Sequence, residues 1–153
     1  MRKEHIHKTF QKMKARNWDT LFWAIDIHDT CIKANYSTTE IPTEFFPYAK
    51  EVLQYLSLKK YHSLILFTCS HDSDVDKYLQ LFEEHDIHFS HVNENPDVPN
   101  TALGAYDKKF YTNFYLDDKA GFDPNNDWKG ILEAIIEIDI IKQREKYENT
   151  RDT

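Results

Sequence analysis

The chain has 153 residues, and its 26 acidic against 19 basic side chains give a formal charge of −7 at pH 7. This length suits one domain, and 41% hydrophobic with 29% charged residues is typical of a globular protein. The negative charge argues against a nucleic-acid binder that works through a general basic field, although binding through a local basic patch stays possible. No apolar run is long enough to predict a membrane-spanning segment.

The N-terminal segment 2–16 is predicted to be helical, because Ile6, Phe10 and Met13 recur on one face among lysines and arginines. We expect that face to pack on the body of the protein. Residues 1–17 are therefore interpreted as a helical extension, residues 18–143 as the core domain, and residues 144–153 as a polar tail that frays.

The body alternates continuous apolar runs, which predict buried strands, with segments of helical periodicity. One further strand alternates apolar and polar residues, and one proline- and asparagine-containing stretch is predicted to be a loop. The strands are expected at 21–26, 63–68, 87–92 and 112–117, the helices at 45–59, 72–85 and 127–142, and the loop at 93–106.

This alternation predicts an α/β fold, namely a Rossmann-like three-layer α/β/α sandwich with a mainly parallel central sheet. Ligands of such folds bind beyond the carboxyl ends of the strands, at the point where the strand order reverses. The residues that follow each predicted strand are therefore the first candidates for a functional site.

Polar side chains follow three of these strands. The first strand ends in a run from Asp26 to Thr30, the second in Thr68-Cys69-Ser70 and the fourth in Asp117-Asp118, with Lys108 and Lys109 shortly before the fourth. This combination suits phosphoryl transfer, because an aspartate at a strand end can attack phosphorus and form an aspartyl-phosphate. A Mg2+ ion between Asp26 and Asp117 would remove their repulsion, while Thr68 and a lysine would hold the phosphoryl oxygens.

The segments FWAIDIHDT, LILFT and FYLDD, with a lysine between the last two, resemble in type and order the four motifs of the haloacid dehalogenase (HAD) superfamily. The resemblance covers about residues 20–140. Receiver domains use similar groups, but their acidic pair comes first and their lysine last, so this order does not fit them.

The resemblance implies a role for each matching residue. Asp26 would be the nucleophile and a Mg2+ ligand. The backbone carbonyl of His28 and the carboxylate of Asp117 would complete the protein ligands, with Asp118 holding a water molecule on the ion or the lysine. Thr68, with Cys69 beside it, would bind the phosphoryl group, and Lys109, favoured over Lys108 on spacing, would stabilise it.

The first motif departs from the family pattern, which usually has an aspartate two residues after the nucleophile as the general acid and base. This chain has His28 there. An imidazole can do acid–base work near neutral pH, so His28 is our candidate catalytic acid, although the replacement can also slow or abolish turnover. Asp29 is a weaker candidate, because its side chain is expected to point elsewhere.

The spacing leaves no room for a separate cap domain. About fourteen residues lie between Thr30 and Phe45, enough for a small flap only. A capless site predicts a large phosphorylated substrate, or a site covered by the loop 93–106 or by a second copy in a homo-oligomer. The acidic balance makes a polynucleotide substrate the weaker expectation.

Other site classes find no support. The two cysteines, Cys31 and Cys69, lack CxxC spacing, so a zinc site is not indicated and a reducing, cytoplasmic compartment is the simplest expectation. With 3 glycines, the chain has neither a P-loop nor a GxGxxG motif. The sequence thus predicts a Mg2+-dependent phosphatase, or alternatively a degenerate HAD-like domain that binds a phosphorylated ligand or partner without turnover.

Overall fold

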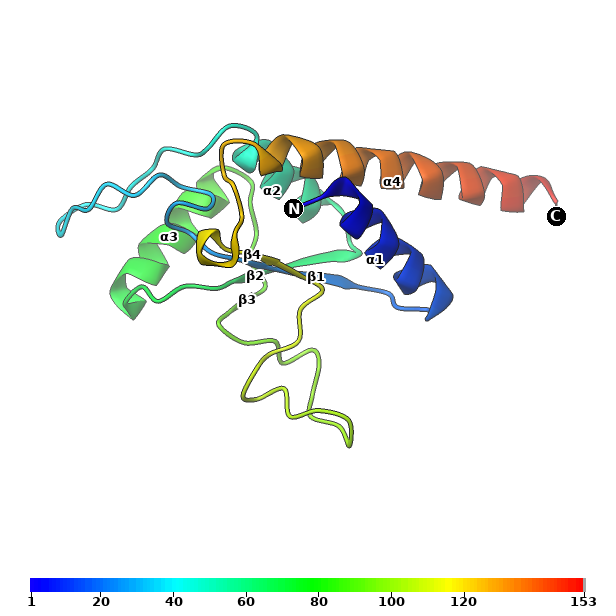
Figure 1. Ribbon diagram of the computed structural model, residues 1–153, viewed down its shortest axis with the longest axis horizontal. Coiled ribbons are helices and arrows are strands. Elements are labelled where there is room, and N and C mark those ends of the chain that lie inside the picture. The colour runs from blue at the N-terminus through cyan, green and yellow to red at the C-terminus, as the bar shows by residue number, and fades with distance from the viewer. Residues whose placement is uncertain (153) are drawn as a thin grey trace.

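The computed structural model describes residues 1–152, and over that range the chain forms a four-stranded parallel sheet with four α-helices (Figure 1). The strands lie in the order β3-β2-β1-β4. The helices are α1 (Lys3–Ala15), α2 (Ala49–Leu58), α3 (Asp72–Glu84) and α4 (Asp127–Arg151), the strands are β1 (Leu21–Ile25), β2 (His62–Leu66), β3 (His91–Val92) and β4 (Phe114–Leu116), and a 3-10 turn, η1 (Asp118–Ala120), follows β4.

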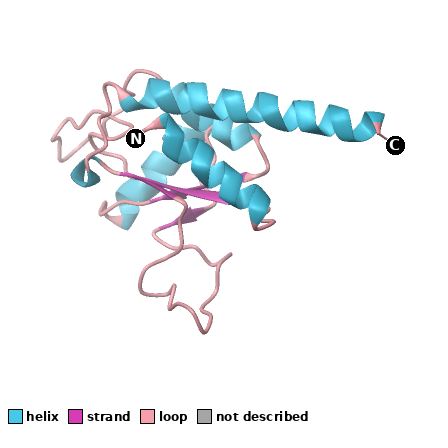
Figure 2. Cartoon of the chain, turned by 45° about the vertical axis from the view of Figure 1, so that its right-hand side comes forward, coloured by secondary structure: helices cyan, strands magenta, loops and turns pink. Residues whose placement is uncertain are grey.

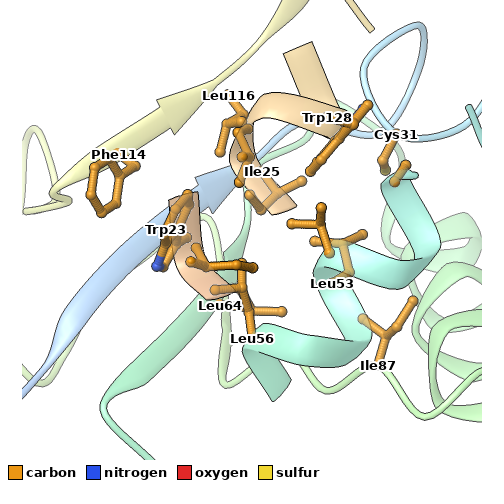
Figure 3. Close-up of a cluster of buried hydrophobic side chains, with 14 of the residues drawn as sticks. Trp23, Ile25, Cys31, Leu53, Leu56, Leu64, Ile87, Phe114, Leu116 and Trp128 are labelled. Carbon is orange, nitrogen blue, oxygen red and sulfur yellow. The ribbon is translucent and has the colours of Figure 1, made fainter. Parts of the chain in front are cut away.

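The main core lies on the helix-covered face of the sheet. Successive strand residues point to opposite faces, and Trp23 of β1 lies in register with Leu64 of β2 and Phe114 of β4. These side chains share one buried cluster with residues from all four helices in the described part of the chain, for example Ile6, Leu53, Val75 and Trp128. Figure 3 shows Trp23 and Ile25 facing this cluster from β1.

The opposite face of the sheet is covered by the segment 93–113, which hangs below the strands in Figures 1 and 2. Aromatic contacts attach it: Phe22 packs edge-on against Tyr111 with ring centroids 6.2 Å apart, and Phe67 packs against Phe110 at 5.5 Å. The predicted Rossmann-like α/β fold with a parallel sheet and no separate cap domain is therefore confirmed, and irregular chain forms its second outer layer.

The N-terminal helix docks as expected. Its buried face consists of Ile6, Thr9, Phe10 and Met13. Lys3 and His7 bond to Glu137 of α4 at 2.6 and 2.8 Å, so polar contacts flank the apolar ones.

Three element boundaries differ from prediction by more than two residues. Helix α2 begins at Ala49 instead of residue 45, because Pro47 disfavours helical backbone before it and Tyr48 adopts a left-handed conformation with φ 67°. Strand β3 keeps two residues of the predicted six, since only His91 and Val92 pair with β2 at this sheet edge.

The third difference concerns the C-terminus. Residues 144–151 were expected to fray, but α4 continues through Arg151 and projects beyond the sheet (Figure 2). Lys142 lies 3.8 Å from the ring centroid of Tyr61, and Lys14 of α1 bonds to Glu145, so contacts support the helix past its apolar stripe. Thr153 lies outside the described residues.

Among the described residues, no helix combines the length and the apolar character that crossing a membrane requires.

Candidate functional site

Three carboxylates converge at the carboxyl ends of two neighbouring strands. Asp26 follows β1, and Asp117 and Asp118 follow β4, which pairs directly with β1. One oxygen from each carboxylate lies within 4.8 Å of the others. The Asp26 N–H donates to the carbonyl of Leu116 at 2.9 Å, so the backbone itself aligns the two strand ends.

Thr30 links the ends of β1 and β4 through hydrogen bonds. Its hydroxyl donates to Oδ2 of Asp26 at 2.9 Å and accepts the backbone N–H of Asp118 at the same distance. Its carbonyl accepts the indole N–H of Trp128, the first core residue of α4, at 2.8 Å. Because Thr30 is fully buried, one side chain orients the Asp26 carboxylate and ties it to the main core.

Asp26 is held in an environment that disfavours its charge. Burial raises the pKa of its carboxyl to about 6, and the neighbouring charges of Asp117 and Asp118 add to the increase, while the hydrogen bond from Thr30 opposes it. A divalent cation would relieve this repulsion, and carboxylate oxygens are the ligands that Mg2+ prefers. The donor set therefore fits a magnesium ion.

His28 reaches the same cavity and is tied to α3. Its Nε2 lies 2.6 Å from the hydroxyl of Tyr78, and the two rings pack edge to face. Burial raises the pKa of Tyr78 to about 12, so its hydroxyl is protonated near neutral pH. Nδ1 is then the ring nitrogen of His28 that is left for a ligand.

Asp29 has a loop-building role. It adopts a left-handed backbone conformation with φ 56°, and its Oδ1 accepts the N–H of Ala34 at 3.1 Å. Its Oδ2 accepts the hydroxyl of Tyr36 at 3.4 Å. The carboxylate thus anchors the loop that follows it.

The second strand end is clamped by Asn93, which follows β3. Oδ1 of Asn93 accepts the N–H of Thr68 and its Nδ2 donates to the Thr68 carbonyl, both at 2.8 Å. The Thr68 hydroxyl donates to Oγ of Ser70 at 2.9 Å and accepts its N–H at 3.1 Å. These bonds fix the turn 68–70 beside the carboxylates, and Cys69 within it is exposed.

One cavity of about 810 Å³ unites these groups. Its floor carries the strand-end residues, and its outer wall is the loop 34–42, which corresponds to the predicted small flap. The lining also includes Phe67, His71, Asp74, Tyr78 and Lys119.

The predicted lysine is not at this cavity. Lys109 is exposed in the segment 93–113, and neither it nor Lys108 belongs to the cavity lining, so the structure does not bring the predicted lysine to the carboxylates. Lys119 lines the cavity instead, with Nζ 3.5 Å from Oδ2 of Asp118. The segment 93–113 lacks helical or strand periodicity, so spacing alone could not place its lysines.

Three residues of the site were missed from the sequence: Tyr78 and Lys119, which line the cavity, and Asn93, which holds Thr68. Tyr78 shares the buried, apolar face of α3 with Val75 and Phe82, so its position gives no signal of a site residue. Asn93 offers one signal, since asparagine tolerates positive φ and here has φ 55°. Lys119 directly follows Asp117 and Asp118 in the chain. This closeness could have marked it as the lysine of the site.

The chain is similar to one solved structure, described as a conserved protein coded by a locus from Bacteroides thetaiotaomicron. The TM-score is 0.55 at 25% sequence identity, and the match covers 77% of this chain and 91% of that chain. No protein-family model matches the chain. No curated protein matches it either.

Proposed function

We propose that this protein is a Mg2+-dependent phosphohydrolase of the HAD type that acts through an aspartyl-phosphate on Asp26. The observation that carries the proposal is the convergence of Asp26, Asp117 and Asp118 within 4.8 Å, beside the Thr68 turn. Three of the four motifs that carry the HAD resemblance supply groups around this cavity, and Lys119 takes the place of Lys109 as the cation.

The sheet order supports the same proposal. Strand β1, which ends in the nucleophile, lies between β2 and β4, and the chain reverses direction across the sheet at this point. Crevices of this kind are where open α/β sheets bind ligands. The likeness to the Bacteroides thetaiotaomicron protein supports the fold and adds nothing on activity.

The carboxylates of Asp26, Asp117 and Asp118 and the backbone carbonyl of His28 would hold the metal ion. When bound, Mg2+ supplies positive charge that neutralises the carboxylates and the phosphoryl oxygens. Thr30 keeps the Asp26 carboxylate oriented for attack, and the turn 68–70 and Lys119 bind the remaining phosphoryl oxygens.

In the first step an oxygen of Asp26 bonds to phosphorus while the bond to the leaving oxygen breaks. His28, as the imidazolium with its Nε2–H donated to the Tyr78 hydroxyl, gives its Nδ1 proton to that oxygen and becomes the neutral imidazole. In the second step His28 takes a proton from water, which attacks phosphorus and regenerates the Asp26 carboxylate.

A second candidate is a binding domain of the same fold that holds a phosphorylated ligand without turnover. The observation that favours it is the imidazole at position 28, whose Nε2 is engaged by Tyr78 at 2.6 Å. A cationic imidazole beside a metal ion is electrostatically disfavoured, which would remove the acid form that catalysis needs.

The test is hydrolysis of p-nitrophenyl phosphate from pH 5 to 9, with and without Mg2+, for wild type and Asp26→Asn. Mg2+-dependent turnover that Asp26→Asn loses supports the phosphohydrolase. No turnover by folded wild type, together with turnover gained in His28→Asp, supports the binding domain instead. If His28 is the acid and base, His28→Ala lowers kcat.

A further inference from the structure

The loop 34–42 carries an aromatic side chain at the mouth of the cavity. Tyr36 is 89% exposed and belongs to the cavity lining. Its backbone has φ 54°, a conformation that bulky L residues rarely adopt. Because the ring buries almost no apolar surface, the hydrophobic effect does not account for its place there.

The loop is braced by its own polar groups. Oγ of Ser37 accepts the N–H groups of Thr39 and Glu40, both at 3.2 Å, and Oδ1 of Asn35 accepts the N–H of Ser37 at 3.1 Å. Nδ2 of Asn35 donates to the Glu40 carbonyl at 3.2 Å. These bonds fix the loop that displays Tyr36.

The Tyr36 ring is also directed toward the catalytic strand end. Its hydroxyl donates to Oδ2 of Asp29, three residues after Asp26 in the chain, at 3.4 Å. The ring therefore stands at the rim of the same cavity that contains the carboxylate cluster, where the leaving group of a bound phosphomonoester would emerge.

The chemistry of this rim limits the leaving group. Ile41 and Pro42 supply apolar surface, while Asp29 and Glu40 supply negative charge. A leaving group with a carboxylate or a second phosphate would be repelled, whereas a neutral planar ring could stack on Tyr36.

We infer that Tyr36 is a specificity-determining residue that selects phosphomonoesters whose leaving group carries an uncharged planar ring. This inference rests on the proposed function, because it takes the carboxylate floor as the phosphoryl end of the site. The ring of the leaving group would then lie at the outer end of the cavity, beside the loop 34–42.

The test measures binding, so that it does not depend on turnover. Titration calorimetry with Mg2+ present compares phenylphosphonate with methylphosphonate, whose P–C bonds the site cannot hydrolyse. Wild type is expected to bind phenylphosphonate roughly three- to tenfold more tightly. Tyr36→Asn is expected to abolish that preference, and it keeps the backbone because asparagine tolerates positive φ. Tyr36→Phe keeps the ring and is expected to retain the preference. Tyr147→Ala removes a similarly exposed tyrosine on α4 and leaves the preference unchanged.

A second pair of ligands tests whether the ring can be separated from the phosphoryl group by a sugar. The affinities of adenosine 5′-monophosphate and ribose 5-phosphate are compared in Asp26→Asn, which prevents turnover. A Tyr36-dependent preference in either pair supports the inference. Equal affinities within both pairs, or a preference that survives Tyr36→Asn, overturn this inference and leave the proposed function standing. If none of these compounds binds with Mg2+ present, the proposed function and this inference are both contradicted.

Discussion

Burial disfavours the charged form of a titratable side chain at both ends of the sheet, with different consequences. Asp26 follows the carboxyl end of β1, and its pKa is raised to about 6. His62 begins β2 at the opposite end, and burial lowers its pKa to about 3. Each group is thus driven toward its neutral form by loss of water.

The surroundings of the two groups differ. His62 accepts the indole N–H of Trp23 at 3.0 Å through Nδ1, and the Tyr61 ring lies 4.2 Å away. The charges of Lys142 and Lys59 lower its pKa further, and Asp139 opposes them. His62 does not line the cavity at the carboxylate cluster, nor the second cavity, which lies between α1 and α4.

Asp26 instead opens onto the main cavity and faces two further carboxylates. A shifted pKa alone would mark both ends as functional. What distinguishes the site is convergence: like charges from separate strand ends gather where a cation could neutralise them, whereas His62 is simply packed.

The largest expected effect tests that convergence. Asp117→Asn should lower Mg2+-dependent turnover by on the order of a hundred- to a thousandfold, because it removes one charged ligand from the cluster. The matched control is Asp74→Asn, which removes a carboxylate from the same cavity lining but not from the cluster. Steady-state kinetics at saturating Mg2+ measures both. Equal losses would mean that general negative charge, not the cluster, matters.

At the opposite end, His62 should make the protein sensitive to acid. Its folded pKa lies below the unfolded value of about 6.5, so its contribution to stability is full above that pH and is lost as pH falls toward 3. From pH 7 to 5 the loss amounts to roughly 2 kcal/mol. Urea unfolding should show a smaller loss in His62→Gln, whose amide oxygen can still accept the Trp23 N–H. An unchanged pH dependence in that variant would refute this assignment.

For Asp26 the sign is opposite. Its raised folded pKa means that the charged carboxylate destabilises the folded protein, increasingly as pH rises from about 4 to 6 and fully above that. Without divalent cations, Asp26→Asn should therefore stabilise the protein at pH 7.5 by roughly 1 to 2 kcal/mol, discounted for partial exposure, and not at pH 3.5. Thermal unfolding in EDTA checks this, with the exposed Asp76→Asn as control. Destabilisation at pH 7.5 would contradict the account.

The smallest effect concerns the Thr68 turn. Asn93→Gly keeps the positive φ but deletes both hydrogen bonds to Thr68, so we expect KM for p-nitrophenyl phosphate to rise roughly three- to tenfold with a smaller change in kcat. Asn93→Asp retains the acceptor for the Thr68 N–H and should recover part of the loss. A change in folding stability without a change in KM would make Asn93 a structural residue only.

The sequence predicts the centre of the site better than its periphery. Asp26, Thr68 and Asp117 follow apolar strands, and parallel strands bring their carboxyl ends to one edge, so their proximity follows from pattern and fold class. Tyr78, Asn93 and Lys119 depend on side-chain directions in a helix and two turns, which periodicity does not encode.

The fold shows the same division. The helices and buried strands occupy the expected regions, because their apolar periodicities are strong. The start of α2 could have been read from Pro47, which restricts the residue before it. The loop 93–106 was predicted, but the packing of the segment 93–113 on the sheet could not be, since its aromatic contacts join residues far apart in the chain.

The central claim is that Asp26 is phosphorylated in a reaction that needs Mg2+. The most direct measurement quenches p-nitrophenyl phosphate turnover with acid and maps the peptides by mass spectrometry. The account predicts the mass of one phosphoryl group on the peptide containing Asp26, present only with Mg2+ and absent in Asp26→Asn. Burst-phase turnover with the phosphoryl group on His28 or another residue, or an adduct that persists in Asp26→Asn, would contradict it.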